Sequence, residues 1–251
     1  MKRSWKHLLI AALGLSLMIG DAQASVVIAG TRVIFPGQDR EVTLKVSNNG
    51  SAPALVQAWL DDGNQNSSPD TMEVPFTVSP AMFRLDPSKG QALRIISTGA
   101  SLAHDKETLY WLNVLEIPPK AKALSTEANK LQLAFRTRIK FMYRPDNLQG
   151  RSDDSPGQVR WEVIRMEKGV GYALKATNPT PYFVNLGQIS LVLKDKGYDA
   201  GAGFIAPGET TIFPIVGLTQ SIDNSAEVKY LSINDFGGGV KGEYVIGSAR
   251  K

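Results

Sequence analysis

The 251-residue sequence has no cysteine and only two histidines, His7 and His104. Without cysteine there is no disulfide to stabilise the fold, no thiolate to bind a metal and no thiol nucleophile. Two histidines far apart in the chain also argue against a histidine-rich zinc site. We therefore expect a fold held together by packing alone, with no cofactor and no bound metal.

Long apolar runs are also scarce, and the most prominent one lies at the amino terminus. A basic lead at residues 1–7 precedes an apolar run of twelve residues at 8–19, and residues 22–24 (AQA) form a small-x-small cleavage site. Because a membrane helix needs about 20 apolar residues, the pattern predicts a signal peptide over residues 1–24, cleaved before Ser25. We expect an exported protein that is not inserted in the membrane.

The excess of positive charge is small in the predicted mature chain. The whole sequence has a formal charge of +4, but residues 1–24 contain three cations and one anion, so their removal leaves +2. Nucleic-acid binding depends on a strong basic excess. The charge therefore gives no support for a nucleic-acid partner.

Short strands separated by turn residues account for residues 25–145. The segment Val42–Val46 alternates apolar and polar residues with a period of two, which is typical of a strand with one solvated face. Turns rich in glycine, proline and asparagine recur about every dozen residues. About seven strands in some 120 residues match an immunoglobulin-like sandwich. The predicted strands are residues 26–35, 41–47, 54–60, 75–85, 91–97, 108–117 and 131–143.

A polar, glycine-bearing stretch at residues 147–157 interrupts this pattern and predicts a linker or long turn. We place a domain boundary near Asp146, which gives domains at residues 25–145 and 146–251. The second domain resumes the strand pattern and is expected to be a smaller sandwich. Its predicted strands are residues 161–166, 172–177, 182–193, 210–215, 228–233 and 240–246.

The predicted strand at residues 131–143 is unusually long, with apolar residues on one parity and cations on the other. One interpretation is an ordinary core strand with a solvated face. The other is an edge strand that offers its backbone and side chains to a partner by strand addition.

Six motifs, in order and spacing, resemble the periplasmic pilus-assembly chaperones of the PapD-like type over almost the whole mature chain. The resemblance implies an all-β fold of two immunoglobulin-like domains joined at an angle, with a cleft between them and no catalytic step. It also implies that the protein works in the periplasm, where it folds and caps pilus subunits and delivers them to an outer-membrane usher. The motifs are AGTRVIFP at 29–36, FRL at 83–85, EIPP at 116–119, RIKFMYRP at 138–145, NPTPYF at 178–183 and INDFGG at 233–238.

The resemblance assigns roles to particular residues. Arg32 and Lys140 match the cleft cations that bind the terminal carboxylate of a subunit, which suits the charge-assisted hydrogen bonds that a carboxylate accepts. Leu131, Leu133 and Phe135 match the side chains that enter the groove of the incomplete subunit. Because Lys140 has the opposite parity from Leu131, we expect a bulge or strong twist between them.

Three further positions, Glu116, Arg144 and Asp235, match an ion-pair network that holds the two domains of such chaperones at a fixed angle. The 14-residue loop at residues 117–130 resembles the short-loop subclass that serves rod-like pili. The sequence leaves open whether the Ser79–Pro80 bond is cis, and whether free molecules cap one another as dimers through the exposed strand.

Enzymatic alternatives have weak support. His104 lies near Ser101 and Asp105, but no nucleophile-elbow motif accompanies them. Asp61 and Asp62 precede a glycine and are explained as turn residues more simply than as a glycosidase pair. The glycine run at 237–239 lacks the lysine and the helix of a phosphate-binding loop.

A non-enzymatic alternative is an exported two-domain adhesion or structural protein that itself joins a fibre. Such a subunit would be expected to carry an amino-terminal donor extension and a domain that lacks one strand. Neither is visible, because the predicted mature chain passes from Ser25 straight into a strand.

Overall fold

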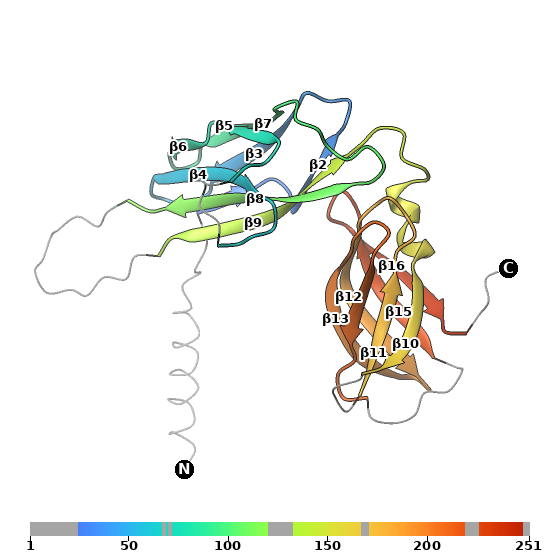
Figure 1. The fold of residues 1–251 in the computed structure, drawn as a ribbon. Coiled ribbons are helices and arrows are strands. Elements are labelled where there is room, and N and C mark those ends of the chain that lie inside the picture. Colours follow the sequence, from blue (N-terminus) through green and yellow to red (C-terminus); the bar gives the residue numbers. More distant parts are fainter. Residues whose placement is uncertain are drawn as a thin grey trace, which may run out of the picture.

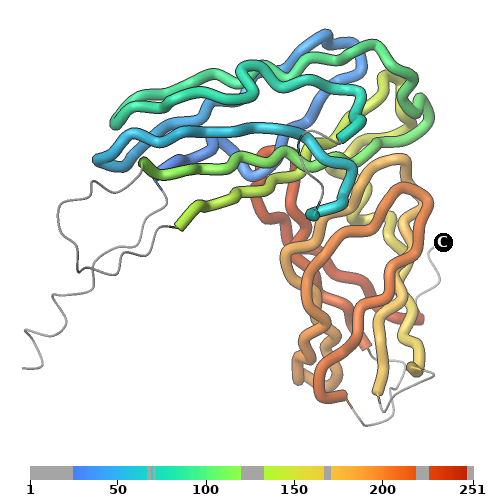
Figure 2. Tube along the Cα trace, turned by 60° about the vertical axis from the view of Figure 1, so that its left-hand side comes forward, coloured from blue at the N-terminus to red at the C-terminus, as the bar shows by residue number. Residues whose placement is uncertain are grey.

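The computed structural model describes residues 25–66, 69, 72–119, 133–166, 171–218 and 226–247. They form two β-sandwiches, each with its own buried apolar core, that meet at an angle (Figures 1 and 2). The predicted all-β class with two immunoglobulin-like sandwiches is confirmed. The predicted signal peptide lies outside the described residues.

The amino-terminal domain consists of a four-stranded sheet, β1-β3-β7-β5, and a five-stranded sheet, β2-β9-β8-β4-β6. Aromatic rings fill the space between the sheets, with the centroids of Phe76 and Phe141 4.9 Å apart and those of Phe35 and Phe76 5.0 Å apart. The strands are β1 (Val26–Ile28), β2 (Arg32–Pro36), β3 (Glu41–Asn48), β4 (Ala54–Asp61), β5 (Phe76–Ser79), β6 (Met82–Leu85), β7 (Gly90–Ser97), β8 (Thr108–Ile117) and β9 (Phe135–Arg144).

Two of the predicted strands are each divided in the structure. The run at 26–35 becomes β1 and β2, which belong to different sheets, and the chain changes direction at Gly30 with a positive φ of 139°. The run at 75–85 is divided into β5 and β6 at the Ser79–Pro80 peptide bond, which is cis. Each division lets one continuous apolar run contribute to both sheets.

The carboxyl-terminal domain packs the three-stranded sheet β10-β11-β14 against the four-stranded sheet β13-β12-β15-β16. Trp161, Phe213 and Tyr230 lie between the sheets, and the rings of Trp161 and Tyr230 stack with centroids 5.9 Å apart. The strands are β10 (Arg160–Arg165), β11 (Tyr172–Thr177), β12 (Val184–Leu193), β13 (Lys196–Ile205), β14 (Thr210–Pro214), β15 (Glu227–Ile233) and β16 (Gly239–Val245).

Strand β13 was not predicted from the sequence. Its sequence, KGYDAGAGFI, has three glycines, which are depleted in strands because they lack a side chain to pack. The tertiary structure overrides this weak propensity, since β13 forms a hairpin with β12 through Lys194 and Asp195, both of which have positive φ.

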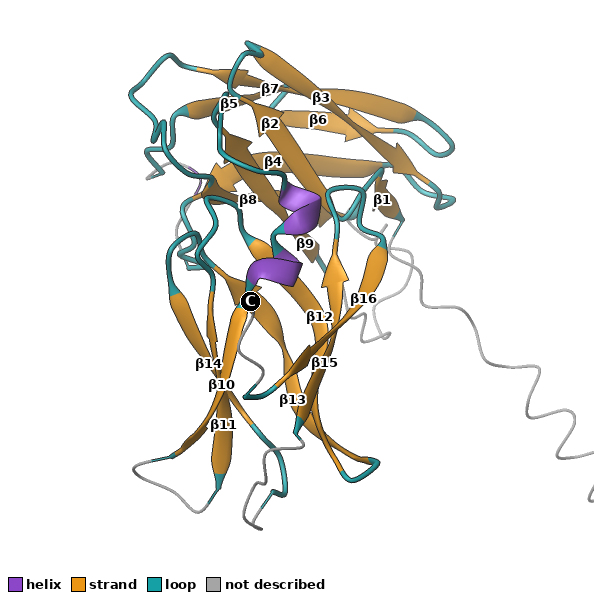
Figure 3. Cartoon of the chain, turned by 90° about the vertical axis from the view of Figure 1, so that its right-hand side faces the viewer, coloured by secondary structure: helices purple, strands orange, loops and turns teal. Residues whose placement is uncertain are grey.

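The predicted linker forms the junction between the domains, with two short 3-10 turns, η3 (Ser152–Asp154) and η4 (Pro156–Gln158), drawn in purple in Figure 3. Tyr182 of the second domain donates a hydrogen bond from its hydroxyl to the Gly150 carbonyl at 3.1 Å. In the part of the chain that the structure describes, no helix has the length and hydropathy needed to cross a bilayer.

Candidate functional site

Strand β9 runs along one edge of the amino-terminal domain towards the junction with the second domain (Figure 1). It pairs antiparallel with β8 over Phe135–Tyr143, but parallel with β2 only over Lys140–Arg144. Along residues 135–139, the edge that faces away from β8 therefore has no strand partner among the described residues. Such an edge presents unpaired backbone donors and acceptors to another chain.

The side chains of β9 that point towards the core change character along the strand. Ile139, Phe141 and Tyr143 are buried, whereas Phe135 is 47% exposed and Leu133, just before the strand, is 52% exposed. Apolar side chains on this face of the strand thus extend beyond the core and are exposed to solvent at Leu133 and Phe135. Leu131, the third predicted donor residue, lies outside the described residues.

The other parity of β9 carries cations that are paired within the domain. Arg138 and Arg136 form ion pairs with Asp61, whose carboxylate is fully buried at the end of β4. Arg138 also lies over the Trp111 ring, 4.2 Å from its centroid. Burial alone would raise the pKa of Asp61, but hydrogen bonds from Arg138 and Asn113 outweigh it, so this pKa lies below its usual value.

The two predicted carboxylate-binding residues are adjacent. Arg32 and Lys140 are Cα partners in the parallel ladder of β2 and β9, and each contacts the second domain. Arg32 donates to the Ile233 carbonyl at 3.1 Å, and Lys140 donates to the amide oxygen of Asn185. The Nε of Arg32 is buried without a hydrogen-bond partner among the described residues. An unpaired buried donor is costly, so this site favours an incoming acceptor.

Burial, together with a smaller contribution from repulsion by Arg32, lowers the pKa of Lys140 to about 8. Burial also lowers the pKa of Arg32, against the attraction of Asp235. The two cations therefore lie close together and partly desolvated, without an ion pair of their own in the described part of the chain. A carboxylate would relieve both their repulsion and their unmet hydrogen bonding.

Arg144, at the end of β9, links the two domains. Its guanidinium donates to Asp235 of the second domain at 2.7 and 2.9 Å and to Glu107 of the first at 2.6 Å. Glu107 also accepts the backbone N–H of Phe183 at 2.6 Å, and its own N–H donates to the Pro181 carbonyl at 2.9 Å. The geometry brings the predicted residues Arg144 and Asp235 together.

The assignment of Glu116 to this network is corrected by the structure. Glu116 accepts the hydroxyl of Ser25 and the backbone N–H of Val26 at 3.0 Å, and so holds the start of β1. In the antiparallel β8–β9 ladder Glu116 lies opposite Phe135, nine residues along β9 from Arg144, which is about 30 Å at strand spacing. Glu107, just before β8, occupies the end nearest Arg144.

A bulge or strong twist was expected between Leu131 and Lys140, and no bulge occurs in the part of that stretch from Phe135 onward that the structure describes as strand. The β8–β9 ladder runs without a register shift from Thr108 opposite Tyr143 to Glu116 opposite Phe135. The opposite parities of Phe135 and Lys140 do not conflict, because a partner that adds a strand at an edge meets both faces of that edge.

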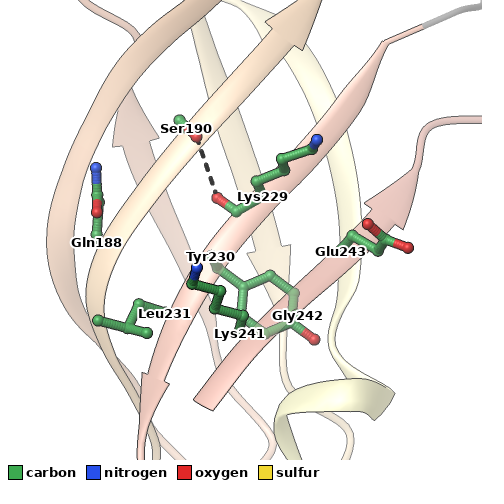
Figure 4. Close-up of a pocket in the computed structure, with 8 residues that line it drawn as sticks. All are labelled: Gln188, Ser190, Lys229, Tyr230, Leu231, Lys241, Gly242 and Glu243. Atoms are coloured by element: carbon green, nitrogen blue, oxygen red, sulfur yellow. Dashed lines mark hydrogen bonds between the residues drawn. The ribbon is translucent and has the colours of Figure 1, made fainter. Parts of the chain in front are cut away.

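The second domain also has a hollow away from the cation pair. It has a volume of about 610 Å³, lies across β12, β15 and β16, and is open to solvent (Figure 4). None of the residues predicted from the sequence lines it. Its lining residues are Gln188, Ser190, Lys229, Tyr230, Leu231, Lys241, Gly242 and Glu243.

Comparison with known families matches both halves of the chain. Residues 25–149 match the family described as "Pili and flagellar-assembly chaperone, PapD N-terminal domain", and residues 154–244 match "Pili assembly chaperone PapD, C-terminal domain". The chain belongs to the PapD family of pilus-assembly chaperones. The resemblance seen in the sequence motifs is therefore confirmed.

Relatives of this chaperone match it along most of their length. It is 41% identical over 222 residues to the probable fimbrial chaperone YadV of Escherichia coli, with 87% of this chain and 89% of that protein covered. It is 40% identical over 245 residues to the chaperone protein FimB/FhaD of Bordetella pertussis, with 95% and 96% covered.

Solved structures show the same architecture. The YadV chaperone superposes with a TM-score of 0.75 at 40% identity, over 88% of this chain and 99% of the other. SafB of Salmonella enterica, solved in complex with the SafA pilin, gives a TM-score of 0.73 at 29% identity, over 90% and 99%.

Proposed function

We propose that this chaperone caps pilus subunits in the periplasm by lending them β9 and delivers them to an outer-membrane usher. The observation that carries the proposal is that the unpaired edge of β9 lies directly beside the two cations. The unpaired edge of β9 ends where the pairing with β2 begins, at the Arg32 and Lys140 pair. A subunit strand added along this edge would have its terminal carboxylate beside both cations.

The direction of the added strand follows from this arrangement. The free edge runs from Phe135 to Ile139, and the cations lie at its carboxyl-terminal end. A subunit chain that ends at Lys140 therefore runs parallel to β9. Five residues of edge provide a ladder of about 16 Å.

Leu133 and Phe135 provide the apolar part of the interaction. Both are about half exposed, and they point to the side of β9 that the domain's own core covers further along the strand. Burying such a side chain in a partner stabilises the complex by roughly 1.5–3 kcal/mol each. We assign Leu131 the same role as part of this proposal.

Glu107, Arg144 and Asp235 hold the second domain beside this edge, which fixes the direction in which a subunit can approach. A buried ion-pair network of this kind specifies an orientation more than it adds stability. The same exposed edge gives free molecules a way to cap one another as dimers. The chemistry is binding only, without nucleotide, metal or catalytic step.

Co-expression with candidate pilus subunits tests this function. Lys140→Glu and Leu133→Glu are expected to abolish recovery of subunit from the osmotic-shock fraction, because uncapped subunits are degraded. Ile212→Glu is the matched control, since Ile212 is 46% exposed on β14 of the other domain. Equal subunit recovery with all three variants would reject the site, and chaperone found in sheared fibres would favour a fibre protein.

A further inference from the structure

The wall of the second domain that meets Lys140 carries an amide and an aromatic ring. Asn185, near the start of β12, is only 6% exposed, and its Oδ1 accepts a hydrogen bond from the Lys140 ammonium. The ring centroid of Phe204, on β13, lies 4.4 Å from the same nitrogen. An ammonium from one domain is thus held by two side chains of the other.

Lys140 differs from the other cations on the same face of β9 because its hydrogen-bond partner is uncharged. Arg136 and Arg138 are paired with the Asp61 carboxylate, and Arg144 is paired with Glu107 and Asp235. Lys140 receives an amide oxygen instead. An amide oxygen accepts a hydrogen bond without neutralising the charge, and the ammonium keeps two further N–H donors.

We propose that Asn185 is a positioning residue of the subunit-binding site, which fixes the Lys140 ammonium at the domain junction and leaves its charge for the subunit carboxylate. The inference rests on the proposed function. The second domain then takes part in subunit binding through Asn185, whose hydrogen bond with Lys140 is already formed before the subunit arrives. A positioned side chain loses less conformational freedom on binding, which favours affinity.

The groups that face Lys140 agree with this role. Arg32, on β2, is the charged group whose repulsion lowers the pKa of Lys140, in the same direction as burial. The groups that contact the ammonium from the other elements are uncharged: Asn185 on β12, Phe204 on β13 and Trp111 on β8, whose ring centroid is 5.9 Å away. The environment therefore holds the cation in place but does not neutralise it.

Replacing Asn185 by a carboxylate separates positioning from charge. Asn185→Asp keeps an acceptor at the same place but neutralises Lys140, so it should compete with the subunit carboxylate. In cells that also express a differently tagged parent chaperone, we expect the variant to capture at least about tenfold less subunit than the parent. Gln188→Glu adds the same charge three residues along β12, at the hollow of Figure 4, and should capture subunit like the parent.

The pH titration of the Lys140 Cε chemical shift provides a reading that a merely structural role would not move. Asn185→Asp should raise the pH at which Lys140 titrates. Asn185→Leu removes the acceptor without adding charge and should lower that pH. Asn185→Ser keeps a neutral acceptor and should restore part of the capture that the leucine variant loses.

Failure of this inference can be distinguished from failure of the proposed function. Parent-like capture by Asn185→Asp, together with loss of capture by Lys140→Met, would overturn the role of Asn185 alone. Parent-like capture by Lys140→Met would overturn the anchoring site itself. If Asn185→Asp does not fold, an unchanged Lys140 titration in Asn185→Leu is sufficient to overturn the inference.

Discussion

Arg32 and Lys140 are neighbours across the parallel ladder of β2 and β9, at the carboxyl-terminal end of the unpaired edge of β9. Two cations in that position repel one another, and burial makes their charge more costly. The fold tolerates this cost at the place where a partner can supply an anion. The relationship links the strand-donating edge to its chemical anchor.

Subunit binding should be coupled to proton uptake near pH 8. The pKa of Lys140 lies at about 8, below its usual value, so the folded chain binds fewer protons than the unfolded chain between pH 8 and about 10.5. A bound carboxylate favours the charged form. At pH 8, binding should therefore take up about half a proton per complex.

Calorimetry of the subunit complex in buffers of different ionisation enthalpy measures this uptake. Lys140→Met should bind more weakly and show no uptake that depends on this group. Equal proton uptake by the parent and by Lys140→Met would assign the titration to another residue.

Removing Arg144 should destabilise the junction between the domains. Arg144→Met leaves the Glu107 carboxylate, which is almost fully buried, without its cation, and is expected to lower the free energy of unfolding by about 3 kcal/mol. Urea denaturation measures the loss. Because Arg84 is a highly exposed partner of Asp86, Arg84→Met is the control and should leave the urea midpoint unchanged.

A second change can recover part of that loss. Adding Glu107→Gln to Arg144→Met removes the unpaired buried charge, so the double variant should be more stable than Arg144→Met alone. If the double variant loses as much stability as Arg144→Met and Glu107→Gln lose together, the two side chains do not interact as the geometry indicates.

Asp61 should make the protein sensitive to acid. Because the pKa of Asp61 lies below its usual value, its contribution to stability is present above the unfolded-state pKa of about 3.9 and is lost as the pH falls through the folded-state value. Asp61→Asn should cost about 2–3 kcal/mol at pH 7. It should also flatten the dependence of stability on pH below pH 4, as followed by thermal unfolding at several pH values.

The exposed edge of β9 should promote self-association of free chaperone. Phe135 is about half exposed beside unpaired backbone groups, so sedimentation should show dimers that increase with concentration. Phe135→Glu should shift the equilibrium towards monomer, with little change in the free energy of unfolding. Dimers that persist in this variant would place the contact on another surface.

Local sequence signals were sufficient for most strands, whereas the two cations Arg32 and Lys140 were named by the family resemblance of the motifs that contain them. Alternation over Val42–Val46 and turn residues every dozen positions indicated short strands, because a strand with one buried face must alternate. The missing strand β13 shows the limit of this reasoning. Its glycines weaken the local signal, and only its pairing with β12 makes it a strand.

Contacts between residues far apart in the chain were less predictable. Glu116 and Glu107 are both carboxylates on the same side of the sequence from Arg144, and nothing in their local sequence ranks one over the other. Asn185 lies in a strand whose pattern predicts burial but not a cation partner. These contacts depend on where two domains meet, which local periodicity does not describe.

The sequence by itself determined the all-β class and the cationic and apolar parities of β9, since these follow from composition and from a period of two along the chain. It also carried the motifs by which the chain resembles the chaperone family. The tertiary structure decided which carboxylate meets Arg144 and which side chain holds Lys140. Glu107 and Glu116 lie at opposite ends of β8, and nine residues of extended strand span about 30 Å. Only the carboxylate at the end that faces the second domain can reach Arg144, and the folded arrangement of the two domains decides which end that is.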